Sequence, residues 1–153
     1  MKRLRNTFIL CAAALFAVTG LLKLVGLAIG AVNSARPDPA LMMVPLWATM
    51  GVAAALELGC ASLCFSRASY RLKLFMILWL SGLFASYRVC LWLEGKNPEC
   101  PCLGYLVAGG PQFRMLIFHT LGWFIAATFI ACTLFLLDEW MAGDARASRP
   151  RHR

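Results

Sequence analysis

Two cysteines separated by a single residue, Cys100 and Cys102, are the side chains of this sequence best suited to chemistry. They flank Pro101 in segment 99–104, where an extended backbone would let the two thiols close a small, strained disulfide ring. Strained and exposed disulfides exchange readily, whereas a disulfide that closes so short a loop stabilises a fold very little. The spacing therefore favours a redox-active pair over a structural clamp.

A third cysteine, Cys90, lies at the end of the apolar run before this loop. We expect it either to act as a resolving thiol for the pair or to pack as a small buried hydrophobic residue. Cys60 and Cys64 would share one helix face, which would suit a second thiol relay, but we favour buried, inert thiols for them and for Cys11 and Cys132. A structural zinc site needs about four ligands, and the loop has no histidine or further cysteine, so no metal is predicted.

Three charged residues interrupt the apolar runs: Lys23, Glu57 and Arg88. Each costs about 2.5–3.5 kcal/mol in a membrane helix unless it is paired or hydrated, so each is a candidate functional residue. We predict that Glu57 pairs with Lys23 to fix the helix register, and a proton path beside the redox loop is the alternative. For Lys23 and Arg88, the simpler interpretation is that their long side chains reach out to the membrane surface.

His119 would lie one turn into the last apolar run, near the predicted redox loop. Because histidine titrates near neutral pH, it could donate protons to the thiols; the alternative is a hydrogen bond to a neighbouring helix. The tryptophans near the predicted membrane boundaries are interpreted as interface anchors; they are Trp47, Trp92, Trp123 and Trp140. No phosphate-binding, dinucleotide or haem-attachment motif is present in the sequence.

The elements that must position these residues are membrane helices. Of the 153 residues, 61% are hydrophobic and 14% are charged, whereas soluble domains carry about 25% charged residues. Four apolar runs are long enough to span a bilayer; they cover residues 8–30, 41–65, 74–93 and 115–137. We therefore predict an all-α bundle of four transmembrane helices over residues 8–137, followed by a basic tail, 138–153, that is too polar to pack.

The basic residues give this bundle an orientation. Ten Lys and Arg residues fall on one predicted side, at positions 2, 3, 5, 67, 71, 73, 146, 149, 151 and 153, and three fall on the other, at positions 36, 96 and 114. The positive-inside rule then places both termini in the cytoplasm and the cysteine loop on the periplasmic or outer side of the cell membrane, where disulfides persist. The net charge of +8 is thus interpreted as a topology signal, and no nucleic-acid partner is predicted.

Several motifs together resemble the MauE/DoxX superfamily of four-helix membrane proteins, and within it the MauE family of methylamine utilisation. The matching segments are 19–24 (TGLLKL), 57–59 (ELG), 87–88 (YR) and 99–104 (ECPCLG), and the resemblance extends over residues 8–137. One departure is Leu103, which stands where an aromatic residue is expected.

The resemblance implies a redox-associated membrane protein that works with a periplasmic thioredoxin-like partner or supports the maturation of an extracytoplasmic enzyme. By match, Cys100 and Cys102 are the thiol pair, and Lys23, Glu57 and Arg88 form the polar set within the membrane. The predicted activity is thiol–disulfide exchange.

Two other functions remain open from the sequence. One is a non-enzymatic scaffold or accessory subunit in which the cysteine pair only clamps the loop. The other is a quinone-linked thiol oxidase similar to the vitamin K epoxide reductase or DsbB groups, with a quinone as the cofactor. Those groups use a Cys-x-x-Cys motif and a second pair of loop cysteines, and neither occurs here.

Overall fold

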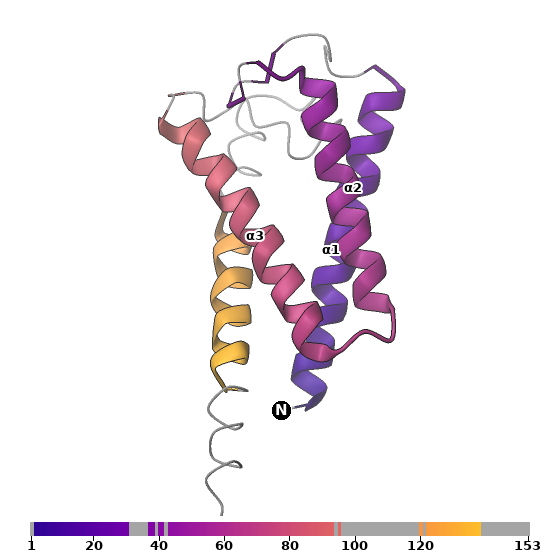
Figure 1. Cartoon of the computed structure of the whole chain (residues 1–153), viewed down its shortest axis with the longest axis vertical. Helices are drawn as coiled ribbons and strands as arrows, with labels where there is room; N and C mark the ends of the chain where they lie inside the picture. Colours follow the sequence, from indigo (N-terminus) through magenta and orange to yellow (C-terminus); the bar gives the residue numbers. More distant parts are fainter. Residues whose placement is uncertain are drawn as a thin grey trace, which may run out of the picture.

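The computed structural model describes residues 2–30, 37–38, 40–41, 43–93, 95, 120 and 122–138. Within this part of the chain the regular structure is helical, with α1 (Lys2–Ala28), α2 (Leu46–Phe65) and α3 (Tyr70–Leu93) joined by short connections (Figure 1). A shorter apolar helix, Gly122–Asp138, follows and is called the fourth helix. The predicted all-α class is confirmed for the described residues.

Helices α1, α2 and α3 are each long and apolar enough to cross a membrane, as expected for a multi-pass membrane protein. Their buried residues form narrow stripes, and many large apolar side chains point outward, among them Val52 and Phe65 of α2. An outward-facing apolar surface of this kind suits hydrocarbon better than water. The fourth helix, as described, is shorter than the other three.

Helices α1 and α2 run antiparallel and pack closely along their length (Figure 1). They approach closely at Gly20, where an added Cβ atom would lie 3.0 Å from Cγ of Leu58 and 3.3 Å from the carbonyl oxygen of Ala54. A glycine is therefore required here for the two backbones to come together, as is common where membrane helices meet through small residues. This contact brings the charged positions of the two helices to the same level.

The fourth helix lies beside α3 and also reaches the start of α1 (Figure 1). Phe129 packs over Gly82 of α3, and the rings of Phe135 and Phe8 meet edge to face with centroids 5.5 Å apart. The apolar core thus draws on all four of these helices, and it includes Phe16 of α1.

One end of the bundle collects basic side chains. Lys73 donates hydrogen bonds of 2.7 Å to the carbonyl oxygens of Cys64 and Ser66, which closes the turn between α2 and α3. Arg5 pairs with Asp138 at the end of the fourth helix and lies 5.6 Å from the ring centroid of Tyr70. The starts of α1 and α3 and the end of the fourth helix are therefore neighbours.

The opposite end is organised by Asp38, which is buried although it lies outside the helices. Its carboxylate accepts hydrogen bonds from the backbone N–H groups of Ala40 and Leu41, at 2.8 and 3.0 Å, and from the hydroxyl of Tyr87 in α3. Helix α2 consequently begins at Leu46, after Pro45, and not at residue 41 as the apolar run predicted. The Asp38 side chain stabilises a turn at a place where the apolar run predicted the first residues of the helix.

Two other predicted boundaries are also wrong. Helix α1 begins at Lys2 and not at residue 8, because basic residues are good helix formers that an apolar run does not register. Helix α3 begins at Tyr70 and not at residue 74, so Arg71 and Lys73 are helical. The predicted tail beyond Asp138 and most of the predicted loop 94–114 lie outside the described residues.

Candidate functional site

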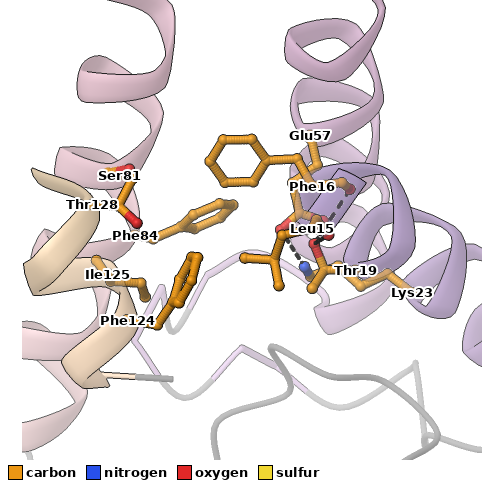
Figure 2. A pocket seen from close by; sticks show the side chains of 10 residues that line it. All are labelled: Leu15, Phe16, Thr19, Lys23, Glu57, Ser81, Phe84, Phe124, Ile125 and Thr128. Atoms are coloured by element: carbon orange, nitrogen blue, oxygen red, sulfur yellow. Dashed lines mark hydrogen bonds and ion pairs between the residues drawn. The ribbon is translucent and has the colours of Figure 1, made fainter. Parts of the chain in front are cut away.

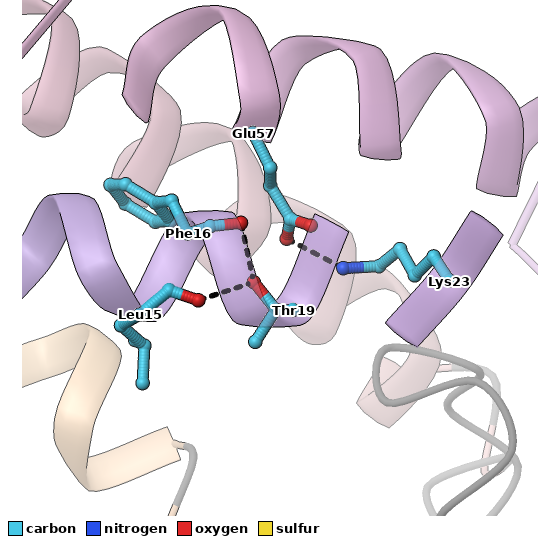
Figure 3. Close-up of polar contacts among 5 residues, drawn as sticks. All are labelled: Leu15, Phe16, Thr19, Lys23 and Glu57. Carbon is cyan, nitrogen blue, oxygen red and sulfur yellow. Dashed lines mark hydrogen bonds and ion pairs between the residues drawn. The ribbon is translucent and has the colours of Figure 1, made fainter. Parts of the chain in front are cut away.

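The most distinctive polar feature inside the bundle is an ion pair between α1 and α2 (Figure 3). Nζ of Lys23 lies 2.5 Å from Oε1 of Glu57, and the two side chains are 5% and 4% exposed. The ammonium group also lies 5.5 Å from the ring centroid of Phe84 in α3. The predicted pairing is confirmed, and the alternative in which Lys23 extends to the membrane surface is wrong.

The local sequence explains why these two side chains meet. Lys23 lies one turn beyond Gly20, where α1 touches α2, and Glu57 is adjacent to Leu58 at the same contact. Both side chains are buried beside this contact. Because a lone charge would be costly there, each residue stabilises the other.

Thr19 occupies the same face of α1, one turn before Lys23. It lies beside the Glu57 carboxylate, but its hydroxyl hydrogen is directed to the backbone carbonyls of Leu15 and Phe16, at 3.0 and 3.3 Å (Figure 3). Oε2 of Glu57 is buried and has no hydrogen-bond partner among the described residues. One oxygen of the carboxylate is therefore paired, and the other is available to a ligand.

A cavity of about 40 Å³ adjoins this pair (Figure 2). Two further buried polar residues line it, Ser81 of α3 and Thr128 of the fourth helix. Figure 2 shows them on the opposite side of the cavity from Thr19 and Glu57, with aromatic rings between. Neither residue could be predicted from the sequence, because serine and threonine are common in membrane helices and a single one carries no signal.

Arg88 is not part of this constellation. It lines a wide groove between α3 and the fourth helix, and its guanidinium group lies 3.3 Å from a Cβ atom built on Gly122. Its side chain is only partly buried. The polar set suggested by the resemblance is thus divided in the structure, with Lys23 and Glu57 together and Arg88 elsewhere.

Cys90 lines the same groove as Arg88 and is exposed. The alternative in which it packs as a buried hydrophobic residue is therefore wrong, and a role as a resolving thiol stays a prediction. The other residues predicted to carry the redox chemistry, Cys100, Cys102 and His119, lie outside the described residues.

Three cysteines predicted to be buried are so: Cys60, Cys64 and Cys132 belong to one apolar core cluster. Cys60 and Cys64 lie on the buried face of α2, as their spacing on one helix face implies. Cys11 is exposed on α1, so its predicted burial is wrong. No group of three or more potential ligands that could hold a metal ion occurs among the residues that the structure describes.

Comparison with known proteins adds no family to this geometry. No family model matches the chain, and no curated protein or solved structure is significantly similar to it. The resemblance to the MauE/DoxX superfamily therefore stays a prediction made from sequence motifs.

Proposed function

We propose that this protein carries out thiol–disulfide exchange at the outer face of the cell membrane, with Cys100 and Cys102 as the reactive pair. A periplasmic thioredoxin-like protein is the proposed partner. The observation that carries the proposal is the separation of the two bundle ends: one end gathers basic residues, and the helices that flank the cysteine segment turn back at the other.

The described contacts support this separation. Arg5, Tyr70 and Asp138 meet at the basic end, and Lys73 closes the α2–α3 turn there. At the other end, Tyr87 in the last turns of α3 binds Asp38, and Arg88 lies against Gly122 at the start of the fourth helix. The chain thus leaves α3 and re-enters the fourth helix at the end away from the basic cluster. By the positive-inside rule, that end faces out of the cytoplasm.

The proposed topology has four spans, with both termini in the cytoplasm. The apolar run 115–137 is long enough to cross the bilayer, and the fourth helix occupies most of it. A fourth crossing returns the chain to the basic end, where Asp138 contacts Arg5. The basic residues beyond position 138 then lie on the cytoplasmic side, together with those before α1.

The proposed exchange transfers two electrons from the cysteine pair to the partner's disulfide. A thiolate of the cysteine pair attacks the partner's disulfide and forms a mixed disulfide, releasing one partner thiolate. The second thiolate of the pair then attacks its neighbour's sulfur and displaces the partner's remaining thiolate. The partner leaves reduced, and the pair is left as a disulfide; the reverse sequence oxidises the partner.

Trapping of mixed disulfides tests this proposal. Cys100→Ser and Cys102→Ser each remove one thiol, so the remaining one should hold the partner in a covalent complex that a reductant releases. The double variant should trap nothing, and Cys11→Ser, which removes an exposed cysteine on α1, should behave as the unmodified chain. Absence of a trapped partner in both single variants would contradict the proposal.

A quinone-linked form of this function has one observation in its favour. A pocket of about 210 Å³ lies between α2 and α3, lined mainly by apolar side chains together with Lys23, Asp38 and Tyr87. Its size suits a substituted six-membered ring, since an apolar cavity of about 150 Å³ can hold benzene. A quinone there would accept the two electrons and two protons released when the dithiol closes. Extraction of the purified protein and detection of a stoichiometric quinone would support this form, and its absence would exclude a resident quinone.

A further inference from the structure

Buried polar side chains in this bundle converge on one place. Six polar or charged residues of the described chain are buried, and five of them line the 40 Å³ cavity beside the ion pair. They come from all four described helices: Thr19 and Lys23 from α1, Glu57 from α2, Ser81 from α3 and Thr128 from the fourth helix. Such convergence within an apolar bundle indicates a site, because isolated polar groups are costly in membranes.

The hydroxyl groups at the cavity differ from those elsewhere on the helices. Ser86 and Thr133 donate to the backbone carbonyl four residues earlier, at 2.7 and 2.9 Å, as do Thr7 and Ser62. This bond is the usual way for a hydroxyl to satisfy itself in a helix. Ser81 and Thr128 make no such bond to the residues that the structure describes, although both are buried. Their hydroxyl hydrogens are therefore available to a ligand in the cavity.

The Glu57 carboxylate on the opposite side of the cavity can accept a hydrogen bond from a ligand. Oε1 of Glu57 is taken by Lys23, and Oε2 has no partner in the described part of the chain. The Thr19 hydroxyl lies beside this carboxylate but donates to the backbone carbonyls of Leu15 and Phe16, so it leaves Oε2 without a hydrogen bond. The cavity thus presents an acceptor at one pole and two hydroxyls, each donor and acceptor, at the other.

We propose that this cavity is an internal water site, holding about two or three water molecules that connect Glu57 Oε2 with Ser81 and Thr128. A water molecule needs about 10–15 Å³ of cavity volume and two to four polar partners, and the site supplies both. The water joins the α1–α2 pair to α3 and the fourth helix by hydrogen bonds within a cavity that aromatic rings also line. It also hydrates the ion pair, which lowers the cost of keeping charge within the bundle.

This site does not depend on the proposed thiol chemistry, so its test is separate. The full chain, labelled with ¹³C and ¹⁵N, is reconstituted in phosphatidylcholine vesicles, and solid-state NMR measures magnetisation transfer from water to side-chain carboxyl carbons. The Glu57 signal is identified by its loss in Glu57→Gln. We expect rapid transfer from water to this carboxyl carbon, comparable to transfer to exposed carboxylates and at least threefold faster than to core methyl groups.

Matched double variants separate the site from the fold. Ser81→Ala with Thr128→Val removes the two cavity hydroxyls and should reduce the transfer at least twofold. Ser86→Ala with Thr133→Val changes the same residue types on the same helices outside the cavity and should leave it unchanged. Thr128→Ser keeps a hydroxyl and should preserve the transfer. A Glu57 carboxyl that receives no more magnetisation than core methyl groups, or an equal loss in both double variants, would overturn the proposal.

Discussion

Among the residues that the structure describes, two ion pairs join α1 to another helix, and they do so in opposite surroundings. Lys23 and Glu57 are at most 5% exposed and meet inside the bundle, whereas Arg5 and Asp138 are 18% and 40% exposed and meet at the basic end. The inner pair is shielded from bulk solvent, and each charge has the other as its close partner. The outer pair keeps water and is subject to screening by salt.

The difference shows what each pair can contribute. A buried pair adds little net stability, but it strongly favours the helix arrangement that keeps the two charges together, because either charge alone would be left uncompensated. It therefore fixes how α1 lies on α2. An exposed pair contributes little and can be replaced without moving a helix. Substitutions at the inner pair should therefore have larger effects than substitutions at the outer pair.

Lys23→Met should destabilise the bundle by about 3–5 kcal/mol at neutral pH, because it leaves the Glu57 carboxylate buried without its partner. The measurement is the free energy of unfolding in mixed micelles, followed by circular dichroism. Lys23→Met combined with Glu57→Gln removes both charges and should recover at least half of the loss. Equal losses in the single and double variants would show that the pair does not act as a unit.

Gly20→Ala should destabilise the bundle by about 1–3 kcal/mol, because the new methyl group would lie 3.0 Å from Leu58 and 3.3 Å from the backbone of α2. Gly59→Ala is the matched control, since nothing lies within 4 Å of the Cβ position there, and it should be neutral or stabilising by up to about 1 kcal/mol. Thermal unfolding of both variants compares them directly. A Gly20 variant as stable as the control would remove the close approach as the reason the inner pair forms.

Tyr87→Phe should cost about 1.5 kcal/mol, because it removes the hydroxyl that donates to the buried carboxylate of Asp38. The expected loss of stability is intermediate between those for the two ion pairs, because this hydrogen bond is partly buried but only one partner carries a charge. A double-mutant cycle with Asp38→Asn measures the coupling between the two side chains. Additive effects would indicate that the bond does not hold α3 to the segment before α2.

Arg5→Ala should change the free energy of unfolding by at most about 1 kcal/mol, because both partners of the outer pair remain partly hydrated. Asp138→Ala should behave in the same way, and raising the salt concentration should reduce either effect further. Unfolding in micelles at low and high salt measures this. A loss as large as that of Lys23→Met would erase the distinction between the inner and outer pairs.

The fold class and the inner ion pair could be predicted because apolar length and buried charge are strong local signals. Lys23 and Glu57 are each the charged residue of an otherwise apolar run. An ion pair between them was therefore the simplest prediction, and the structure confirms it. Helix boundaries were less predictable. The start of α2 depends on Asp38, whose carboxylate turns the chain through contacts that no hydrophobic pattern encodes.

The cavity residues show where sequence reasoning ends. Ser81 and Ser86 are serines of the same helix, and Thr128 and Thr133 are threonines of another. Only the packing of the four helices decides which hydroxyl faces the cavity and which is bonded to its own helix. In the same way, Arg88 was grouped with Lys23 and Glu57 by motif, whereas helix rotation places it in the groove with Cys90. Side-chain direction depends on how each helix packs, and a single sequence does not specify that.

The proposed function depends most on which side of the membrane holds the cysteine pair and whether it reacts. A chain that keeps only Cys100 and Cys102 allows one direct measurement, labelling with a membrane-impermeant maleimide in intact cells, with and without prior mild reduction. We predict that both thiols are labelled in intact cells once they are reduced. Labelling only after the membrane is opened, or thiols that never change redox state, would contradict it.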